Sequence, residues 1–127
     1  MSTKGHETVF VVEDEPLVRK MALRILRGLG YVVVEAADSA EAARRLDDLG
    51  GRIDLLVTDI IMPGGSGREL AELFRRGKPD LKVLFTSGYS ENATSRHGVV
   101  DAGVHFLPKP YGPTELAAAV REVLDER

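Results

Sequence analysis

Short apolar runs alternate along this chain with longer stretches whose apolar residues recur three and four positions apart. The short runs predict five strands, and each is followed by a stretch that predicts a helix. The predicted strands cover residues 8–13, 31–35, 53–58, 81–86 and 104–107. The predicted helices cover residues 15–29, 38–50, 66–77 and 90–102, with a last one that begins at residue 113. This alternation is typical of a parallel sheet with helices on both faces.

Capping residues mark several of the predicted helix ends. Asp38 and Ser66 are each followed three residues later by a glutamate, which is the arrangement of a capping box. Pro113 lies where a proline suits the first turn of a helix. Asp14 stands just before Pro16, and we expect it to cap the first helix.

The fourth helical stretch, residues 90–102, has the weakest pattern. It contains Asn92, Ser95 and Gly98, and its apolar residues show poor helical periodicity. We therefore expect a short or mobile helix there. The 127 residues otherwise fit a single α/β domain whose core runs from about residue 8 to residue 126.

Composition narrows the functional classes. Apolar residues make up 43% of the chain, which is enough for one core, and the absence of cysteine excludes a disulfide. The net charge is −3 and there is no basic block, so nothing favours direct binding to nucleic acid. No apolar run approaches the roughly 20 residues that a membrane span requires. Residues 1–7 also lack the apolar core of a signal peptide, so we expect a cytoplasmic domain without membrane insertion.

Charged residues stand at the ends of three predicted strands. Glu13 and Asp14 lie at the end of the first strand, Asp59 follows the third, and Lys109 follows the fifth. In a parallel sheet the carboxyl ends of the strands meet at one edge, where ligands bind. Three carboxylates and one ammonium at such an edge form a site for a hard divalent cation such as Mg²⁺.

Each of these residues also has a plainer interpretation. In that interpretation Asp14 is simply a helix cap, Asp59 is a turn residue and Lys109 is a solvated loop residue. Two adjacent carboxylates at a strand end are nevertheless costly unless a cation joins them. Acidic groups after the first strand also exclude a phosphate-binding loop, which would be rich in Gly, Ser or Thr. The two hydroxyls at Thr86 and Ser87 are either ordinary turn groups or donors to a phosphoryl oxygen.

The combination of these residues closely resembles the receiver domain of two-component response regulators, over essentially the whole chain. The resemblance rests on the acidic pair, the strand-end aspartate with its Met-Pro and Gly neighbours, the hydroxyl and the Lys-Pro pair. These residues are Glu13, Asp14, Asp59, Met62, Pro63, Gly67, Ser87, Lys109 and Pro110. The resemblance implies a (βα)5 flavodoxin-like fold, with a five-stranded parallel sheet of strand order 2-1-3-4-5.

The resemblance assigns a role to each residue of the site. Asp59 is the phosphoacceptor, which takes a phosphoryl group from the phosphohistidine of a sensor histidine kinase or a phosphotransfer protein. Glu13, Asp14 and Asp59 hold Mg²⁺ together with the backbone carbonyl of Ile61. Lys109 forms an ion pair with the phosphorylated site, and its peptide bond to the proline that follows is expected to be cis.

The resemblance also implies a conformational switch. Ser87 contacts the phosphoryl group and moves with it, and Phe106 then rotates inward. Plain core packing is the alternative explanation for an aromatic residue at position 106. Thr86 is the alternative to Ser87, and Ser87 is preferred because Gly88 matches the small residue that follows the switch hydroxyl.

Some positions depart from the usual pattern of the family. Glu13 stands where many receivers have aspartate, so it keeps the charge and lengthens the reach. Ile61 and Tyr89 lie two residues after Asp59 and Ser87, at positions that tune hydrolysis of the acyl phosphate. Because neither is a small polar residue that orients water, we expect slow spontaneous dephosphorylation. The weak fourth helix leaves open whether a dimer forms through the usual output face.

Three functions compete at this point. The leading one is a phospho-accepting signalling module whose output is contact with another protein. A Mg²⁺-dependent phosphohydrolase would carry a second acid where this chain has Ile61, so we do not expect an enzyme that turns over an external substrate. The intact Asp59 and Lys109 argue against a degenerate receiver. Residues 5–8 and 85–89 are similar to receivers attached to hybrid kinases, and a free-standing regulator remains the alternative.

Overall fold

The computed structural model describes residues 4–49, 51–62, 65–87 and 104–126, so the predicted helix at 90–102 lies outside the described residues. The main strands are β1 (Thr8–Val12), β2 (Val32–Ala36), β3 (Leu55–Asp59), β6 (Lys82–Ser87) and β7 (Val104–Pro108). The described helices are α1 (Pro16–Gly28), α2 (Ser39–Leu49), α3 (Gly67–Gly77) and α5 (Pro113–Asp125). None of the described helices is long and apolar enough to cross a membrane.

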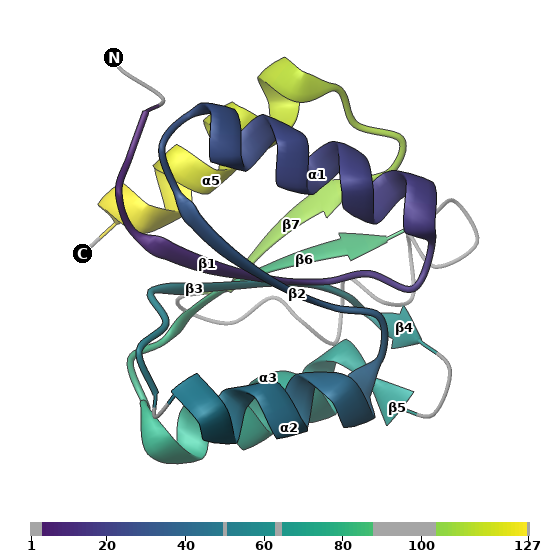
Figure 1. Ribbon diagram of the computed structural model, residues 1–127, viewed down its shortest axis with the longest axis vertical. Helices are drawn as coiled ribbons and strands as arrows, with labels where there is room; N and C mark the ends of the chain where they lie inside the picture. The colour runs from purple at the N-terminus through teal and green to yellow at the C-terminus, as the bar shows by residue number, and fades with distance from the viewer. Residues whose placement is uncertain (1–3, 50, 63–64, 88–103, 127) are drawn as a thin grey trace.

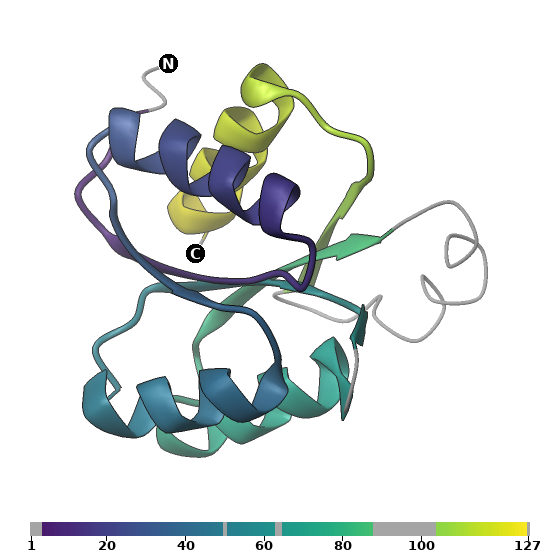
Figure 2. The same cartoon turned by 45° about the vertical axis from the view of Figure 1, so that its right-hand side comes forward.

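The sheet lies between two layers of helices. Its strand order is β2-β1-β3-β6-β7, and every neighbouring pair is parallel. Helices α1 and α5 cover one face of the sheet, and α2 and α3 cover the other (Figures 1 and 2). Since β6 and β7 are the fourth and fifth strands of this sheet along the chain, the predicted flavodoxin-like order 2-1-3-4-5 is confirmed.

Each face of the sheet buries its own apolar cluster. Successive residues of a strand point to opposite faces. Val9 and Leu55 therefore pack with α1 and α5, whereas Phe10 and Leu56 pack with α2 and α3. The ring of Phe10 meets that of Phe74 edge to face, with centroids 5.2 Å apart. Burial on both faces explains why the strands are almost continuously apolar in the sequence.

Strands β2, β3, β6 and β7 each end one residue further along the chain than predicted, and the difference bears on the site in β3 and β6. The predicted strands end at Thr58 and Thr86, but β3 includes Asp59 and β6 includes Ser87. The apolar pattern stops at these points while the ladder continues, because Asp59 lies opposite Thr86 and Ser87 lies opposite Pro108. Asp59 is consequently part of the sheet rather than of the turn that follows it.

The predicted cap of the first helix is wrong. Glu15, not Asp14, occupies the N-cap position of α1, and no side chain caps the helix there. Pro16 begins the helix and has no N–H to satisfy. The N–H of Glu15 donates instead to Glu13 Oε2 at 3.1 Å. The exposed side chain of Asp14 therefore has no capping role.

The other capping predictions are confirmed. The N–H of Glu41 donates to Asp38 Oδ1 at 2.8 Å, ahead of α2. The N–H of Glu69 donates to Ser66 Oγ at 3.2 Å, ahead of α3. Pro113 is the first residue of α5, as its position in the sequence predicted.

A short hairpin that the sequence did not predict follows β3. Strand β4 (Ile61–Met62) pairs antiparallel with β5 (Gly65–Ser66) and leads into α3. Gly67 begins α3 directly against the backbone of Asp59, and a Cβ at this position would collide with the Asp59 carbonyl group. The N–H of Gly67 also donates to the carbonyl of Ile60 at 2.6 Å. Glycine at position 67 thus allows α3 to begin beside the end of β3.

A network centred on Arg121 ties the start of the described chain to α5. Its guanidinium group binds the Glu7 carboxylate through two contacts, Nη2 to Oε2 at 2.6 Å and Nη1 to Oε1 at 3.2 Å. It also donates to the carbonyl of Lys4 and the hydroxyl of Tyr31, both at 3.2 Å, and to Asp125 Oδ1 at 2.8 Å. Hydrogen bonding to Arg121 lowers the pKa of Glu7 to about 2.

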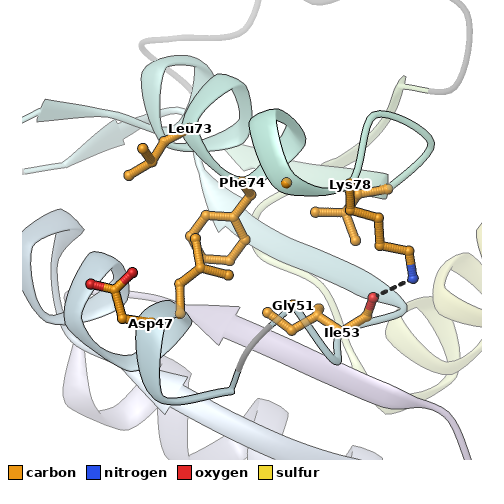
Figure 3. A pocket seen from close by; sticks show the side chains of 9 residues that line it. Asp47, Gly51, Ile53, Leu73, Phe74 and Lys78 are labelled. Atoms are coloured by element: carbon orange, nitrogen blue, oxygen red, sulfur yellow. Dashed lines mark hydrogen bonds between the residues drawn. The ribbon is translucent and has the colours of Figure 1, made fainter.

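A cavity of about 360 Å³ lies at the amino end of the sheet, between α2 and α3. Figure 3 shows its lining, which includes the side chains of Leu73 and Phe74. The charged residues around it are Asp47 and Lys78, and Lys78 Nζ donates to the carbonyl of Ile53 at 2.7 Å. The acidic residues singled out in the sequence do not line this cavity, so the candidate site lies elsewhere.

Candidate functional site

Three carboxylates meet at the carboxyl edge of the sheet. Glu13 and Asp14 follow β1, and Asp59 ends β3, the neighbouring strand. Because Val12 lies opposite Thr58 in this pair, the next residue on each strand brings Glu13 level with Asp59. One oxygen from each of the three side chains lies within 4.8 Å of the others. The structure therefore brings together the acidic residues that the sequence singled out.

Lys109 joins this acidic cluster. Its Nζ lies 2.7 Å from Glu13 Oε1 and 2.6 Å from Asp59 Oδ1. The N–H of Lys109 donates to the carbonyl of Ser87 at 2.7 Å, which attaches the lysine backbone to the end of β6. The peptide bond between Lys109 and Pro110 is cis. The ammonium group is thus positioned by the ends of two strands and bridges two of the carboxylates.

Burial gives the cluster its electrostatic character. Glu13 and Asp59 are 3% and 4% exposed, whereas Asp14 is exposed. Burial, reinforced by the neighbouring Asp59 carboxylate, raises the pKa of Glu13 to about 8. Burial alone would lower the pKa of Lys109, but its hydrogen bonds to Asp59 and Glu13 outweigh that effect and raise it. Lys109 therefore stays charged beside the acidic groups of Glu13 and Asp59.

This set of groups suits a hard divalent cation. Carboxylate oxygens are the ligands that Mg²⁺ prefers in proteins. When Glu13 is ionised, three carboxylates lie around one ammonium, and a bound cation would offset the repulsion from Asp59 that, together with burial, raises the pKa of Glu13. Ile61, whose carbonyl is the predicted fourth ligand, is the first residue of β4 and immediately follows this edge. Glu13, Asp14 and Asp59 are accordingly residues that could hold a metal ion.

The two hydroxyls next to this cluster make different contacts. Thr86 Oγ1 donates to Asp59 Oδ1 at 2.7 Å, and the threonine is buried. Ser87, the hydroxyl favoured from the sequence, is also buried, but its Oγ has no hydrogen-bond partner among the residues that the structure describes. Register accounts for the Thr86 contact, because Thr86 lies directly opposite Asp59 in the β3–β6 ladder. Pairing the positions of β3 and β6 in the sequence could have identified Thr86 as the residue that contacts the Asp59 carboxylate.

The remaining predicted residues lie further from the carboxylates or outside the described chain. Phe106 lies on β7 opposite Phe85, and it packs half-buried against the apolar cluster on the α2 and α3 side. This packing agrees with the plainer interpretation of Phe106, and its role in a switch stays a prediction. Tyr89 lies outside the described residues, so its effect on hydrolysis stays a prediction as well.

Comparison with known proteins decides the family. The sequence profile of the response regulator receiver domain matches residues 9–121. The chain belongs to this family. The receiver is 42% identical over 123 residues to the sensor kinase CckA of Brucella abortus (strain 2308), a match that covers 97% of the chain. It is 30% identical over 118 residues to the phosphate regulon transcriptional regulatory protein PhoB of Klebsiella pneumoniae, covering 91% of the chain.

Solved structures of receivers share the fold. The receiver domain of the hybrid histidine kinase CckA is 38% identical, with a TM-score of 0.78, and the match covers 93% of this chain and 99% of that one. A response regulator described as putative, from Chloroflexus aurantiacus J-10-fl, is 28% identical, with a TM-score of 0.83 and coverage of 96% and 100%. The receiver spans only 13% of the CckA kinase from Brucella and 51% of PhoB, so it corresponds to one part of each relative. The family is one of signalling domains rather than of conventional enzymes.

Proposed function

We propose that this receiver accepts a phosphoryl group on Asp59 and transmits the signal by binding another protein. The donor is the phosphohistidine of a sensor histidine kinase or of a phosphotransfer protein, and the cation is Mg²⁺. The observation that carries the proposal is the buried carboxylate of Asp59, which Lys109 contacts at 2.6 Å and two further acids flank. Phosphoryl transfer depends mainly on positioning and charge neutralisation, and this arrangement supplies both.

The transfer exchanges one bond to phosphorus for another. An oxygen of Asp59 attacks the phosphorus atom, and the O–P bond forms while the P–N bond to the donor histidine breaks. The electron pair of the P–N bond stays on the imidazole nitrogen. Glu13, Asp14, Asp59 and the carbonyl of Ile61 would hold Mg²⁺, which neutralises charge on the phosphoryl oxygens when bound. Lys109 supplies a further positive charge beside the accepting carboxylate.

Ser87 and Phe106 are the proposed switch. The buried Ser87 Oγ, which has no partner within the described part of the chain, is available to donate to a phosphoryl oxygen. Movement of Ser87 would give Phe106 room to turn inward from its half-buried position on β7. The outcome is a population shift between two conformations, of which a downstream protein binds one better.

Turnover of an external substrate is not part of the proposal. A phosphohydrolase of this type needs a second acid two residues after its nucleophile, where the receiver has an exposed Ile61. The same apolar residue supports slow hydrolysis of the acyl phosphate, because it cannot orient water by hydrogen bonding. We propose a single receiver domain that acts in the cytoplasm, without direct contact to nucleic acid.

An NMR titration with beryllofluoride and Mg²⁺ tests the proposal without the cognate kinase. Beryllofluoride mimics the phosphoryl group, so amide shifts should appear around Asp59, Ser87 and Phe106. They should disappear in Asp59→Asn, which removes the accepting carboxylate. The matched control is Asp80→Asn, the same change at an exposed aspartate between α3 and β6, which should respond like the wild type. A wild-type protein that binds Mg²⁺ but shows no response to beryllofluoride would refute the proposed function.

A further inference from the structure

Thr86 makes a contact that the roles assigned above do not use. Its hydroxyl donates to Asp59 Oδ1 at 2.7 Å, and the residue is only 2% exposed, so water does not compete for this bond. The carbonyl of Thr86 accepts the N–H of Ile60 at 3.1 Å, which fixes its backbone beside the residue after Asp59. Lys109 also binds Oδ1, at 2.6 Å. Both donors therefore hold the same oxygen of Asp59.

We propose that Thr86 is a positioning residue that shortens the lifetime of the phosphorylated receiver. The inference rests on the proposed function, because it concerns the acyl phosphate of Asp59. With Oδ1 held by Thr86 and Lys109, Oδ2 is the oxygen that attacks phosphorus. After transfer, Oδ1 is the carbonyl oxygen of the acyl phosphate, and Thr86 remains beside it.

The hydrogen bond from Thr86 changes strength with the state of Asp59. Oδ1 belongs to a charged carboxylate before transfer and to a neutral carbonyl group afterwards. A hydrogen bond to a charged acceptor is roughly twice as strong as one between neutral groups. Thr86 therefore stabilises the free carboxylate more than it stabilises the acyl phosphate.

This difference in hydrogen-bond strength affects the rate at which the acyl phosphate is hydrolysed. A water molecule attacks the phosphorus, the P–Oδ2 bond breaks with its electron pair left on Oδ2, and phosphate departs together with the proton that water loses. The transition state is loose, so much of the negative charge has already returned to Asp59. Thr86 consequently lowers the barrier to hydrolysis. Thr86 has little effect on the rate of phosphorylation. Asp59 carries negative charge both in the free site and in the loose transition state through which it accepts the phosphoryl group.

The lifetime of the acyl phosphate tests the inference. The receiver is phosphorylated with acetyl phosphate and Mg²⁺, the donor is removed, and the loss of the phosphoryl group is followed by intact-protein mass spectrometry. Thr86→Val replaces the hydroxyl with a methyl group of similar shape and should lengthen the half-life about tenfold. Its rate of phosphorylation should stay within about twofold of wild type. Thr86→Ser, which restores a hydroxyl, should return the half-life toward the wild-type value.

Thr58→Val is the matched control. Thr58 is equally buried and adjoins Asp59, but its hydroxyl donates to the backbone carbonyl of Asp59 rather than to the carboxylate. This control should hydrolyse at the wild-type rate. If Thr86→Val folds poorly, Thr86→Ala removes the same hydroxyl and should give the same lengthening.

Two results would overturn the inference. The first is an unchanged half-life in the folded Thr86 variants. The second is an equal slowing of phosphorylation and hydrolysis, which a merely loosened site would produce. A wild-type receiver that acetyl phosphate does not modify on Asp59 would instead overturn the proposed function itself, and the wild-type reaction alone separates that failure from the other two.

Discussion

Replacing Gly67 with alanine tests how closely α3 is built against Asp59, the proposed phosphoacceptor. Glycine in a helix is normally less favourable than alanine by about 0.5–1 kcal/mol, so the exchange should stabilise an unobstructed position. At position 67 the new Cβ would collide with the carbonyl of Asp59 and crowd Cα of Ile60. These are backbone atoms, which cannot rotate away, and crowding of this kind costs roughly 1–3 kcal/mol. We expect Gly67→Ala to lower the free energy of unfolding by about 1–2 kcal/mol.

The same change should also weaken the site. Relief of the collision requires movement of the end of β3 or of the hairpin that follows it. Either movement displaces Asp59 relative to Lys109, whose Nζ now lies 2.6 Å from Oδ1. Gly67→Ala should therefore bind beryllofluoride more weakly than the wild type, in addition to being less stable.

Gly77→Ala provides a control in the same helix. Gly77 is the last residue of α3, and a Cβ there would meet no atom within 4 Å. We expect this variant to be as stable as the wild type or slightly more stable in urea unfolding. Equal urea midpoints for the two variants would refute the close approach at Gly67. A less stable Gly67→Ala with unchanged affinity for beryllofluoride would show that the strain does not reach Asp59.

Two further predictions concern charge. The pKa of Glu7 is lowered to about 2 by Arg121, so the pair stabilises the fold above the unfolded pKa near 4.5 and loses this contribution as pH falls toward 2. The Glu7 side chain is 20% exposed, and Glu7→Gln should lower the free energy of unfolding by about 1–2 kcal/mol at pH 7 and by almost nothing near pH 2. An equal decrease at both pH values, measured by urea unfolding, would contradict this. Mg²⁺ should raise the melting temperature of the receiver, because the three carboxylates are assembled only in the folded state. Asp14→Asn should remove most of that rise while Asp80→Asn keeps it, and a full rise in Asp14→Asn would exclude Asp14 as a ligand.

The acidic edge could be predicted because its position depends on few facts. An apolar run shows where a strand ends, and a parallel sheet gathers those ends at one edge. Glu13, Asp59 and Lys109 all follow from this reasoning, without knowledge of any side-chain contact. The strand order came from the resemblance, and the ladders then confirmed it.

The details that failed depend on contacts across the sheet. The apolar pattern ended β6 one residue early, and it did not show that Thr86 lies opposite Asp59 in the ladder. The hairpin β4–β5 has only two residues in each strand, too few to show an alternating pattern. The cap was assigned to Asp14 only from its position just before Pro16. In the structure the carboxylate of Glu13, rather than that of Asp14, accepts the N–H of Glu15.

The network around Arg121 has a consequence for how the domain can be joined to other chains. It brings the carbonyl of Lys4 within 3.2 Å of a side chain on the last described helix, at the amino edge of the sheet. Asp59 lies at the opposite edge, and Figure 1 shows the start of β1 and the end of α5 away from the hairpin β4–β5. Polypeptide can therefore enter and leave the described part of the domain at one place, far from Asp59. Such geometry permits insertion into a host loop, or circular permutation through a short linker, with the acidic edge left accessible.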